Sequence, residues 1–523
     1  MSLGIVKTQY GKISGVDLGN GITEYRGIPY AKPPIGELRW TPTQPADSWE
    51  GVMACDKYAP AAIQTWLLGK RADEIYYNGL PERSEDCLYI NVITPAQSPE
   101  ERLPVYIWYH DGGMTNGYSH GVEVNPLELV RHGIVVAQVG HRIGEFGYMA
   151  LPQLREEQGQ SGNYGVMDTV TAFNWVWDNI GEFGGNRDEI TIGGQSGGTA
   201  KICALLMIPE LKGKIKRIIN QSGLKWLYTL KTQEEAETIG LEFLKTSGID
   251  PHSTLAQLRV MDTFEIHKDL PVPFIPGDMT LDGVTLSRPF ADALLDGAEG
   301  VSFLNSLTEG EADVFGSTAF GGAGKTISGA EEFYSHFKEL LGDLYEKYDF
   351  ENLIKVTDED AWKTAISLAS QGLTKKGRNN MSRNLMANRI FSELVYKRFP
   401  ESKVYTYMFT HLLPKRNDWA EGDPVEILAP HGSDMWYSYH SLSDEVPPCR
   451  DWRGCDYEMA RILSGYFVNF IKTGNPNSDG LAYWPVGDDT YSWLDMNTSP
   501  VAHERKTKLD ELIYEFVKRY YEI

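Results

Sequence analysis

The 523-residue chain has the composition of a folded globular protein, with 41% hydrophobic and 23% charged residues, which excludes a disordered or fibrous chain. Its 72 acidic and 49 basic residues give a net charge of −23. This charge argues against binding to nucleic acids or membrane surfaces and favours a neutral or cationic small substrate, although it could serve solubility alone.

The order of the predicted elements indicates an α/β protein. Residues 5–15 alternate like a β-hairpin, and β-rich runs then alternate with helical stretches. These runs cover 103–110, 133–140, 189–194, 216–223, 300–307 and 403–411. Apolar strands between helices predict a large, mostly parallel sheet with helices on both faces.

The second half of the chain carries one long helical section. Residues 325–400 contain no convincing strand and predict a helical cap or regulatory insertion, and residues 508–523 predict a helix that packs on the core. We expect residues 1–523 to form a single unit. The sequence has no window of about 18 apolar residues and no basic start followed by an apolar run.

The cysteines favour a reducing environment. They form an odd set without metal spacing or a disulfide framework: Cys55, Cys87, Cys203, Cys449 and Cys455. We therefore expect free thiols and a cytoplasmic protein, unless a native leader has been removed. No cluster of histidines and carboxylates has the spacing of a metal site, so no metal is expected.

A serine between glycines follows one of the predicted strands. Residues 194–198, GQSGG, fit the pattern G-x-S-x-G with a strand before and a helix after, which would expose Ser196 at the positive end of a helix. A nucleophilic serine needs a base, and the base needs an acid. An ordinary turn serine also fits the pattern, and 11 histidines leave the base undecided.

Five motifs that follow one another along the chain give the G-x-S-x-G pattern its context. They lie at residues 26–40, 84–92, 162–186, 193–200 and 429–437. Together they resemble the type-B carboxylesterase/lipase, or cholinesterase-like, family, including its bacterial para-nitrobenzyl-type esterases. The resemblance implies an α/β-hydrolase fold and a serine hydrolase that cleaves carboxylic esters through an acyl-enzyme without a cofactor.

The resemblance also implies a catalytic triad. Ser196 matches the nucleophile, His431 the base, and Glu309, which precedes a glycine as in the family, the acid. Glu311 and Asp313 lie close enough to be rivals for the role of the acid.

The same resemblance places an oxyanion hole at the N–H groups of Gly112, Gly113 and Gly197. Three positions depart from the family pattern. Gln195 replaces a glutamate, Gly197 replaces an alanine, and Asp111 replaces the first glycine of the oxyanion run. We expect the Asp111 carboxylate to point away from the developing charge, which it would otherwise oppose. Asp tolerates positive φ better than most residues, so it can replace glycine at a strained turn.

Other residues could orient the triad or line a substrate pocket. Ser222 and Asp434 match groups that orient the triad, although either could be a local cap. Trp226, Tyr228 and Trp436 could line an acyl or alcohol pocket, and core packing is an equal alternative for each.

Three further interpretations stay open on the same motifs. An amidase or a thioesterase uses the same triad, and a non-catalytic binding protein can share the fold, although such a protein would be expected to lack triad residues. We expect a small-molecule ester substrate, no nucleic-acid or membrane partner, and a monomer or weak homo-oligomer.

Overall fold

The computed structural model describes residues 3–66, 81–224, 227–270, 275–311, 326–375, 384–417, 427–444, 449–488 and 492–522. The chain forms two compact units. The first comprises Met1–Ile219, Thr229–Gly297 and Ile471–Thr473, and the second comprises Asn220–Tyr228, Ala298–Phe470 and Gly474–Ile523.

The first unit is built on strands in the hydrogen-bonded order β9-β7-β8-β6-β4-β3. Their bounds are β3 (Val16–Gly19), β4 (Ile22–Pro29), β6 (Tyr89–Thr94), β7 (Leu103–Tyr109), β8 (Val135–Val139) and β9 (Gly185–Gln195). β7 runs parallel to β8 and β9, whereas β6 runs antiparallel to β4 and β8. Every residue of β8 is buried, including Gln138, as expected of a strand whose sheet is covered on both faces.

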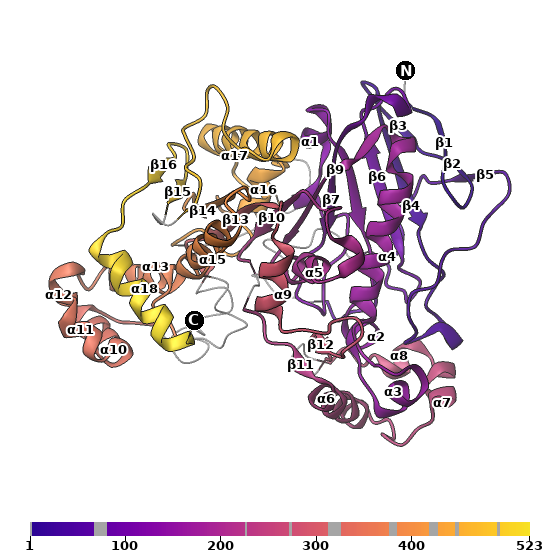
Figure 1. Cartoon of the computed structure of the whole chain (residues 1–523), viewed down its shortest axis with the longest axis horizontal. Helices are drawn as coiled ribbons and strands as arrows, with labels where there is room; N and C mark the ends of the chain where they lie inside the picture. The colour runs from indigo at the N-terminus through magenta and orange to yellow at the C-terminus, as the bar shows by residue number, and fades with distance from the viewer. Residues whose placement is uncertain are drawn as a thin grey trace. The chain divides into compact units, whose positions relative to one another are not determined.

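Helices accompany these strands. They are α1 (Leu127–Arg131), α2 (Gly144–Tyr148), α3 (Pro152–Gln158), α4 (Tyr164–Asn179), α5 (Gly197–Leu206), α6 (Gln233–Thr246), α7 (Leu255–Val260), α8 (Thr263–Ile266) and α9 (Phe290–Gly297). α4 packs against β8 and β9, and α5 packs against β7 and β9 (Figure 1). The predicted N-terminal hairpin consists of β1 (Ile5–Lys7) and β2 (Lys12–Ser14), and β5 (Val52–Ala54) extends it to a small sheet. A short parallel pair joins β11 (Lys231–Thr232) and β12 (Thr280–Leu281).

The second unit contains a further set of strands. They are β10 (Arg217–Gln221), whose first residues belong to the first unit, β13 (Ser302–Thr308), β14 (Val404–Phe409), β15 (Trp493–Met496) and β16 (Val501–His503). β14 runs parallel to β13 and β15, and β16 closes the edge in the antiparallel direction. In this register Ser306 lies opposite Tyr407.

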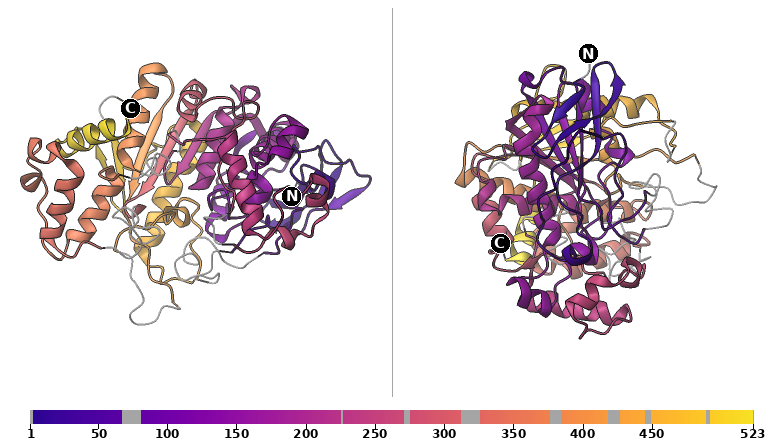
Figure 2. Two further views of the ribbon diagram at one scale, coloured as in Figure 1. Left: turned by 90° about the horizontal axis from the view of Figure 1, so that it is seen from below. Right: turned by 90° about the vertical axis from the view of Figure 1, so that its right-hand side faces the viewer.

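The helical section predicted at 325–400 contains two kinds of helix. α10 (Ala330–Leu341), α11 (Asp343–Lys347), α12 (Phe350–Leu353) and α13 (Ala361–Gln371) stack beside one another (Figure 2). α15 (Leu385–Arg398) instead covers β13 and β14, with Phe391 against Phe303 at 5.3 Å between ring centroids. The unit is completed by α16 (Asp434–Ser438), α17 (Gly454–Thr473), whose last three residues belong to the first unit, and α18 (Lys508–Tyr521). A role for the stacked helices as a cap stays a prediction.

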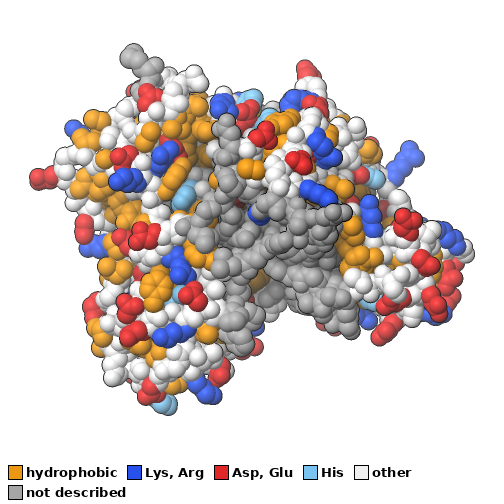
Figure 3. Space-filling model, turned by 180° about the vertical axis from the view of Figure 1, so that it is seen from behind, with side chains coloured by type: hydrophobic (Ala, Val, Ile, Leu, Met, Phe, Trp, Pro, Cys, Tyr) orange, Lys and Arg blue, Asp and Glu red, His pale blue; other side chains and the backbone are white. Residues whose placement is uncertain are grey.

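The surface carries charges of both signs. Figure 3 shows acidic and basic side chains interspersed over the described part of one face. Among the helices that the structure describes, none combines the length and the hydropathy that a membrane crossing requires.

Candidate active site

Ser196 occupies the turn between β9 and α5. Its backbone has φ 51° and ψ −112°, a conformation that costs about 1–3 kcal/mol for a non-glycine residue. The Ser196 carbonyl accepts hydrogen bonds from Thr199 Oγ1 at 2.6 Å and from the Thr199 N–H at 3.1 Å, which holds the turn closed. The Ser196 backbone is therefore held in a turn at the N-terminus of a helix, where the pattern places a nucleophile.

Glycines beside Ser196 allow the backbones around it to meet. A Cβ atom at Gly197 would lie 2.2 Å from the carbonyl oxygen of Gly113, and one at Gly198 would lie 2.4 Å from the carbonyl oxygen of Tyr109. The start of α5 and the loop after β7 are thus in direct backbone contact. Any side chain at either glycine would push the loop away.

The same loop carries the predicted oxyanion donors. Gly112 and Gly113 have φ values of +81° and +67°, and their N–H groups form no hydrogen bond within the described part of the chain. Gly197 is the first residue of α5, where an N–H has no acceptor inside the helix. These donors are free to bind a developing negative charge.

Asp111 differs from expectation in its backbone. It is not among the described residues with positive φ, so the glycine that it replaces is not required by a strained turn. The side chain is 5% exposed, and burial raises the pKa of its carboxyl to about 7, against the opposing charge of Lys201. Gln195, which also departs from the family pattern, is fully buried at the end of β9.

In the second unit, His431 is paired with a carboxylate. Its Nδ1 donates to Glu311 Oε2 at 2.6 Å, and both side chains are buried. The Thr308 N–H donates to Glu311 Oε1 at 3.2 Å, and the Gly310 N–H donates to Ala429 O at 2.8 Å, which ties the two loops together. With Nδ1 holding a proton for Glu311, the other ring nitrogen, Nε2, can accept one.

The structure differs from the sequence prediction on the acid. Glu309 does not bond to His431. Its Oε1 accepts from Ser367 Oγ at 2.9 Å, and its N–H still continues the strand ladder to Phe409 O at 3.0 Å. Burial raises the pKa of Glu309. The contact expected of Glu309 is made by Glu311, while the third candidate, Asp313, lies outside the described residues.

Ser222 and Asp434 are linked through a residue that the sequence reasoning missed. Ser306 Oγ accepts from the Ser222 N–H at 3.3 Å and donates to Asp434 Oδ2 at 2.8 Å. Tyr407 donates to the same oxygen at 2.7 Å. Burial raises the pKa of Asp434. Two polar residues at paired positions of the buried strands β13 and β14 were the available signal for Ser306 and Tyr407.

The predicted pocket aromatics have different surroundings. Trp436 is buried and packs on Trp452 with 5.7 Å between ring centroids. Tyr228 is half-buried, and Trp226 lies outside the described residues. A role for these three in substrate binding stays a prediction.

One group of described side chains has the composition of a metal site. Ligand atoms of His411, Cys455 and Asp456 lie within 4.8 Å of one another. The Asp456 carboxylate already pairs with His411 Nε2 at 2.7 Å and accepts from Tyr437 at 3.1 Å and from the Arg453 N–H at 2.8 Å. These hydrogen bonds account for the cluster without an ion.

Comparison with known proteins covers almost the whole chain. Residues 2–515 match the family model described as carboxylesterase family. The chain is 28% identical to a para-nitrobenzyl esterase of Bacillus subtilis (strain 168), covering 92% of each protein, and 28% identical to carboxylesterase 1D of Mus musculus, covering 96% of this chain and 91% of that one. A solved thermophilic PNB esterase superposes with a TM-score of 0.74 at 25% identity, covering 98% of this chain and 100% of that one. The α/β-hydrolase fold predicted from the sequence is confirmed.

Proposed function

The chain belongs to the carboxylesterase family and is a carboxylic ester hydrolase, and on this premise we propose that it cleaves esters of small to medium size through an acyl-enzyme on Ser196. The observation that carries the proposal is the strained Ser196 turn at the start of α5, in backbone contact with the loop of Gly112 and Gly113.

In the proposed reaction His431 is the general base. Its Nε2 takes the proton of Ser196 Oγ as that oxygen attacks the ester carbonyl carbon, and the same proton then goes to the departing alcohol. Water, activated in turn by His431, attacks the acyl-serine and releases the acid. Glu311 stabilises the imidazolium that forms in each half-reaction, which its 2.6 Å bond to Nδ1 supports.

The oxyanion of each tetrahedral intermediate would bind the N–H groups of Gly112, Gly113 and Gly197. Support comes from the two free loop donors and from the backbone contact between Gly113 and Gly197. Ser222 and Asp434 would act on the triad only indirectly, through the hydrogen bonds that converge on Ser306.

A matched substrate panel tests the proposal. The same acyl group presented as a p-nitrophenyl ester, a thioester and an anilide should be hydrolysed fastest as the ester, and Ser196→Ala should remove that activity. Preference for the anilide or the thioester would make the protein an amidase or a thioesterase. Failure of the wild-type protein to hydrolyse any of them, or to react with a fluorophosphonate, would leave a binding protein.

We also propose a cytoplasmic location and a monomer or weak homo-oligomer. Support comes from Cys55 and Cys87, which are buried and form no disulfide, as suits a reducing compartment. A thiol count on the denatured, non-reduced protein should give five, and light scattering reports the oligomeric state. A disulfide in that count would contradict the location.

A further inference from the structure

A lysine is buried beneath the loop that carries the oxyanion donors. Lys201 lies in the first turns of α5 and is 1% exposed. Its Nζ donates to His110 O at 2.9 Å and makes a longer contact of 3.5 Å with Asp111 O. The ammonium group therefore ties the helix that begins after Ser196 to the backbone of residues 110–113.

The second of these carbonyls, that of Asp111, shares a peptide group with a proposed oxyanion donor. The Asp111 carbonyl belongs to the same peptide unit as the Gly112 N–H. It also accepts from His110 Nδ1 at 3.0 Å. Donors on a carbonyl polarise the whole amide and strengthen the hydrogen bond that its N–H can give. A cation near the Asp111 carbonyl therefore makes the Gly112 N–H a stronger donor to a developing oxyanion.

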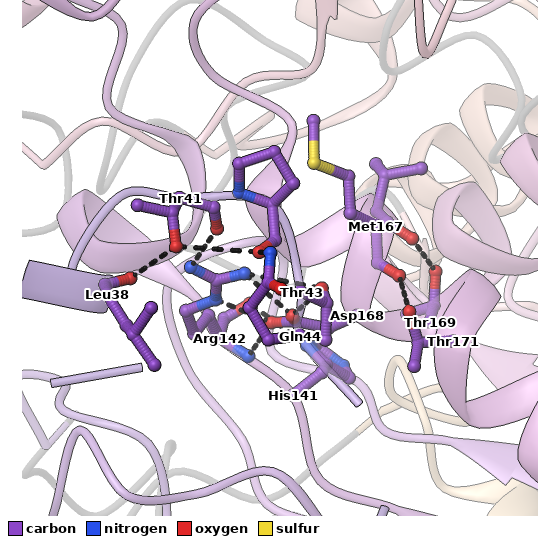
Figure 4. Close-up of polar contacts among 12 residues, drawn as sticks. Leu38, Thr41, Thr43, Gln44, His141, Arg142, Met167, Asp168, Thr169 and Thr171 are labelled. Carbon is purple, nitrogen blue, oxygen red and sulfur yellow. Dashed lines mark hydrogen bonds and ion pairs between the residues drawn. The ribbon is translucent and has the colours of Figure 1, made fainter. Parts of the chain in front are cut away.

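The first residue of the loop also stacks on a second histidine. The His110 ring lies parallel to the ring of His141, with 4.3 Å between centroids. His141 precedes Arg142, whose guanidinium forms two 2.8 Å bonds with the buried Asp168 and one of 3.0 Å with Thr41 O (Figure 4). His110 is thus held through its carbonyl by Lys201 and through its ring by His141, which precedes the ion-paired Arg142.

Burial of Lys201 has a cost. Desolvation lowers its pKa to about 7, and the charge of Asp111 opposes that change. An aliphatic side chain of the same length would avoid the desolvation. What the ammonium adds is therefore its bonds to the loop carbonyls.

We propose that Lys201 is a positioning residue that fixes residues 110–113 and strengthens the Gly112 N–H as an oxyanion donor. The inference rests on the proposed esterase function. It identifies an element of the active site outside the triad and outside the glycines that touch the substrate.

The test compares Lys201→Met, which keeps most of the length without the charge, with Ile202→Val, which perturbs the neighbouring buried position of the same helix. Fluorophosphonate titration gives the concentration of active sites. For Lys201→Met we expect kcat per active site to fall about 10- to 100-fold, with KM within about threefold of wild type. Affinity for a trifluoromethyl ketone, which forms a tetrahedral adduct, should fall in parallel with kcat/KM. Ile202→Val should keep all three values.

Other outcomes have distinct meanings. Three results would overturn the role of Lys201. They are an unchanged kcat per active site in Lys201→Met, an effect of Lys201→Met on KM alone, and an equal fall of kcat in Ile202→Val. If Lys201→Met fails to fold, Lys201→Leu, which also removes the N–H donors, is measured instead, and wild-type kcat there refutes the proposal. Wild-type protein without ester hydrolysis or labelling would refute the esterase function itself.

Discussion

Replacing Glu311 by Gln should abolish most of the turnover, because it removes the charge that faces the imidazolium of His431. The bond is 2.6 Å long, and both side chains are nearly inaccessible. With charge centres about 4 Å apart and an effective dielectric constant near 20, the lost interaction is worth about 4 kcal/mol. At 1.36 kcal/mol per tenfold change, kcat should fall by about three decades.

Glu309→Gln is the matched control, two residues away in the same loop. Its carboxylate bonds to Ser367, so kcat should stay within about threefold of wild type. The assay is p-nitrophenyl ester hydrolysis per titrated active site, with circular dichroism to show that both variants fold. A Glu311→Gln enzyme within tenfold of wild type, or a large loss in Glu309→Gln, would refute the assignment of the acid.

Two further predictions concern the first unit. Gly197→Ala, although it restores the residue usual in the family, should lower kcat about tenfold or more, because its Cβ would lie 2.2 Å from Gly113 O; wild-type kinetics would show that the loop can move aside. Burial lowers the pKa of His267, but its bonds and charge interactions with Glu145 and Asp269 raise the pKa overall, so its stabilising effect should be complete below about pH 6.5 and lost as the pH rises through the folded-state pKa. Chemical denaturation from pH 6 to 9 should show that the difference in free energy of unfolding between wild type and His267→Asn becomes smaller as the pH rises. A difference that stays constant would contradict this.

The Ser196 turn was predictable because its determinants are local. A β-rich run, small residues around the serine and a helical stretch follow one another within about twenty residues. The carboxylate partner of His431 was not predictable, because two glutamates flank one glycine at the end of β13. Which of them reaches His431 depends on a contact across 120 residues of sequence, and the Glu-Gly pair favoured Glu309, which bonds to Ser367 instead.

The helices from 325 to 400 show a similar limit. Periodicity predicts a helix at α15, but it cannot distinguish a helix that covers the sheet from one in an inserted cap, because both bury one face. Every described residue from Leu385 to Ser392 is buried, which reflects contacts with β13 and β14. Lys201 was not predicted as a residue of the site, because a lysine in a helix usually faces solvent.

The most direct test of the account is covalent labelling of Ser196. Wild-type protein treated with a fluorophosphonate should gain one adduct by intact mass, located on Ser196 by peptide mapping, and lose its esterase activity in proportion. Ser196→Ala should fold, gain no adduct and hydrolyse esters about three decades or more slowly. An adduct on another serine, or an active Ser196→Ala protein, would contradict the proposal that Ser196 is the nucleophile.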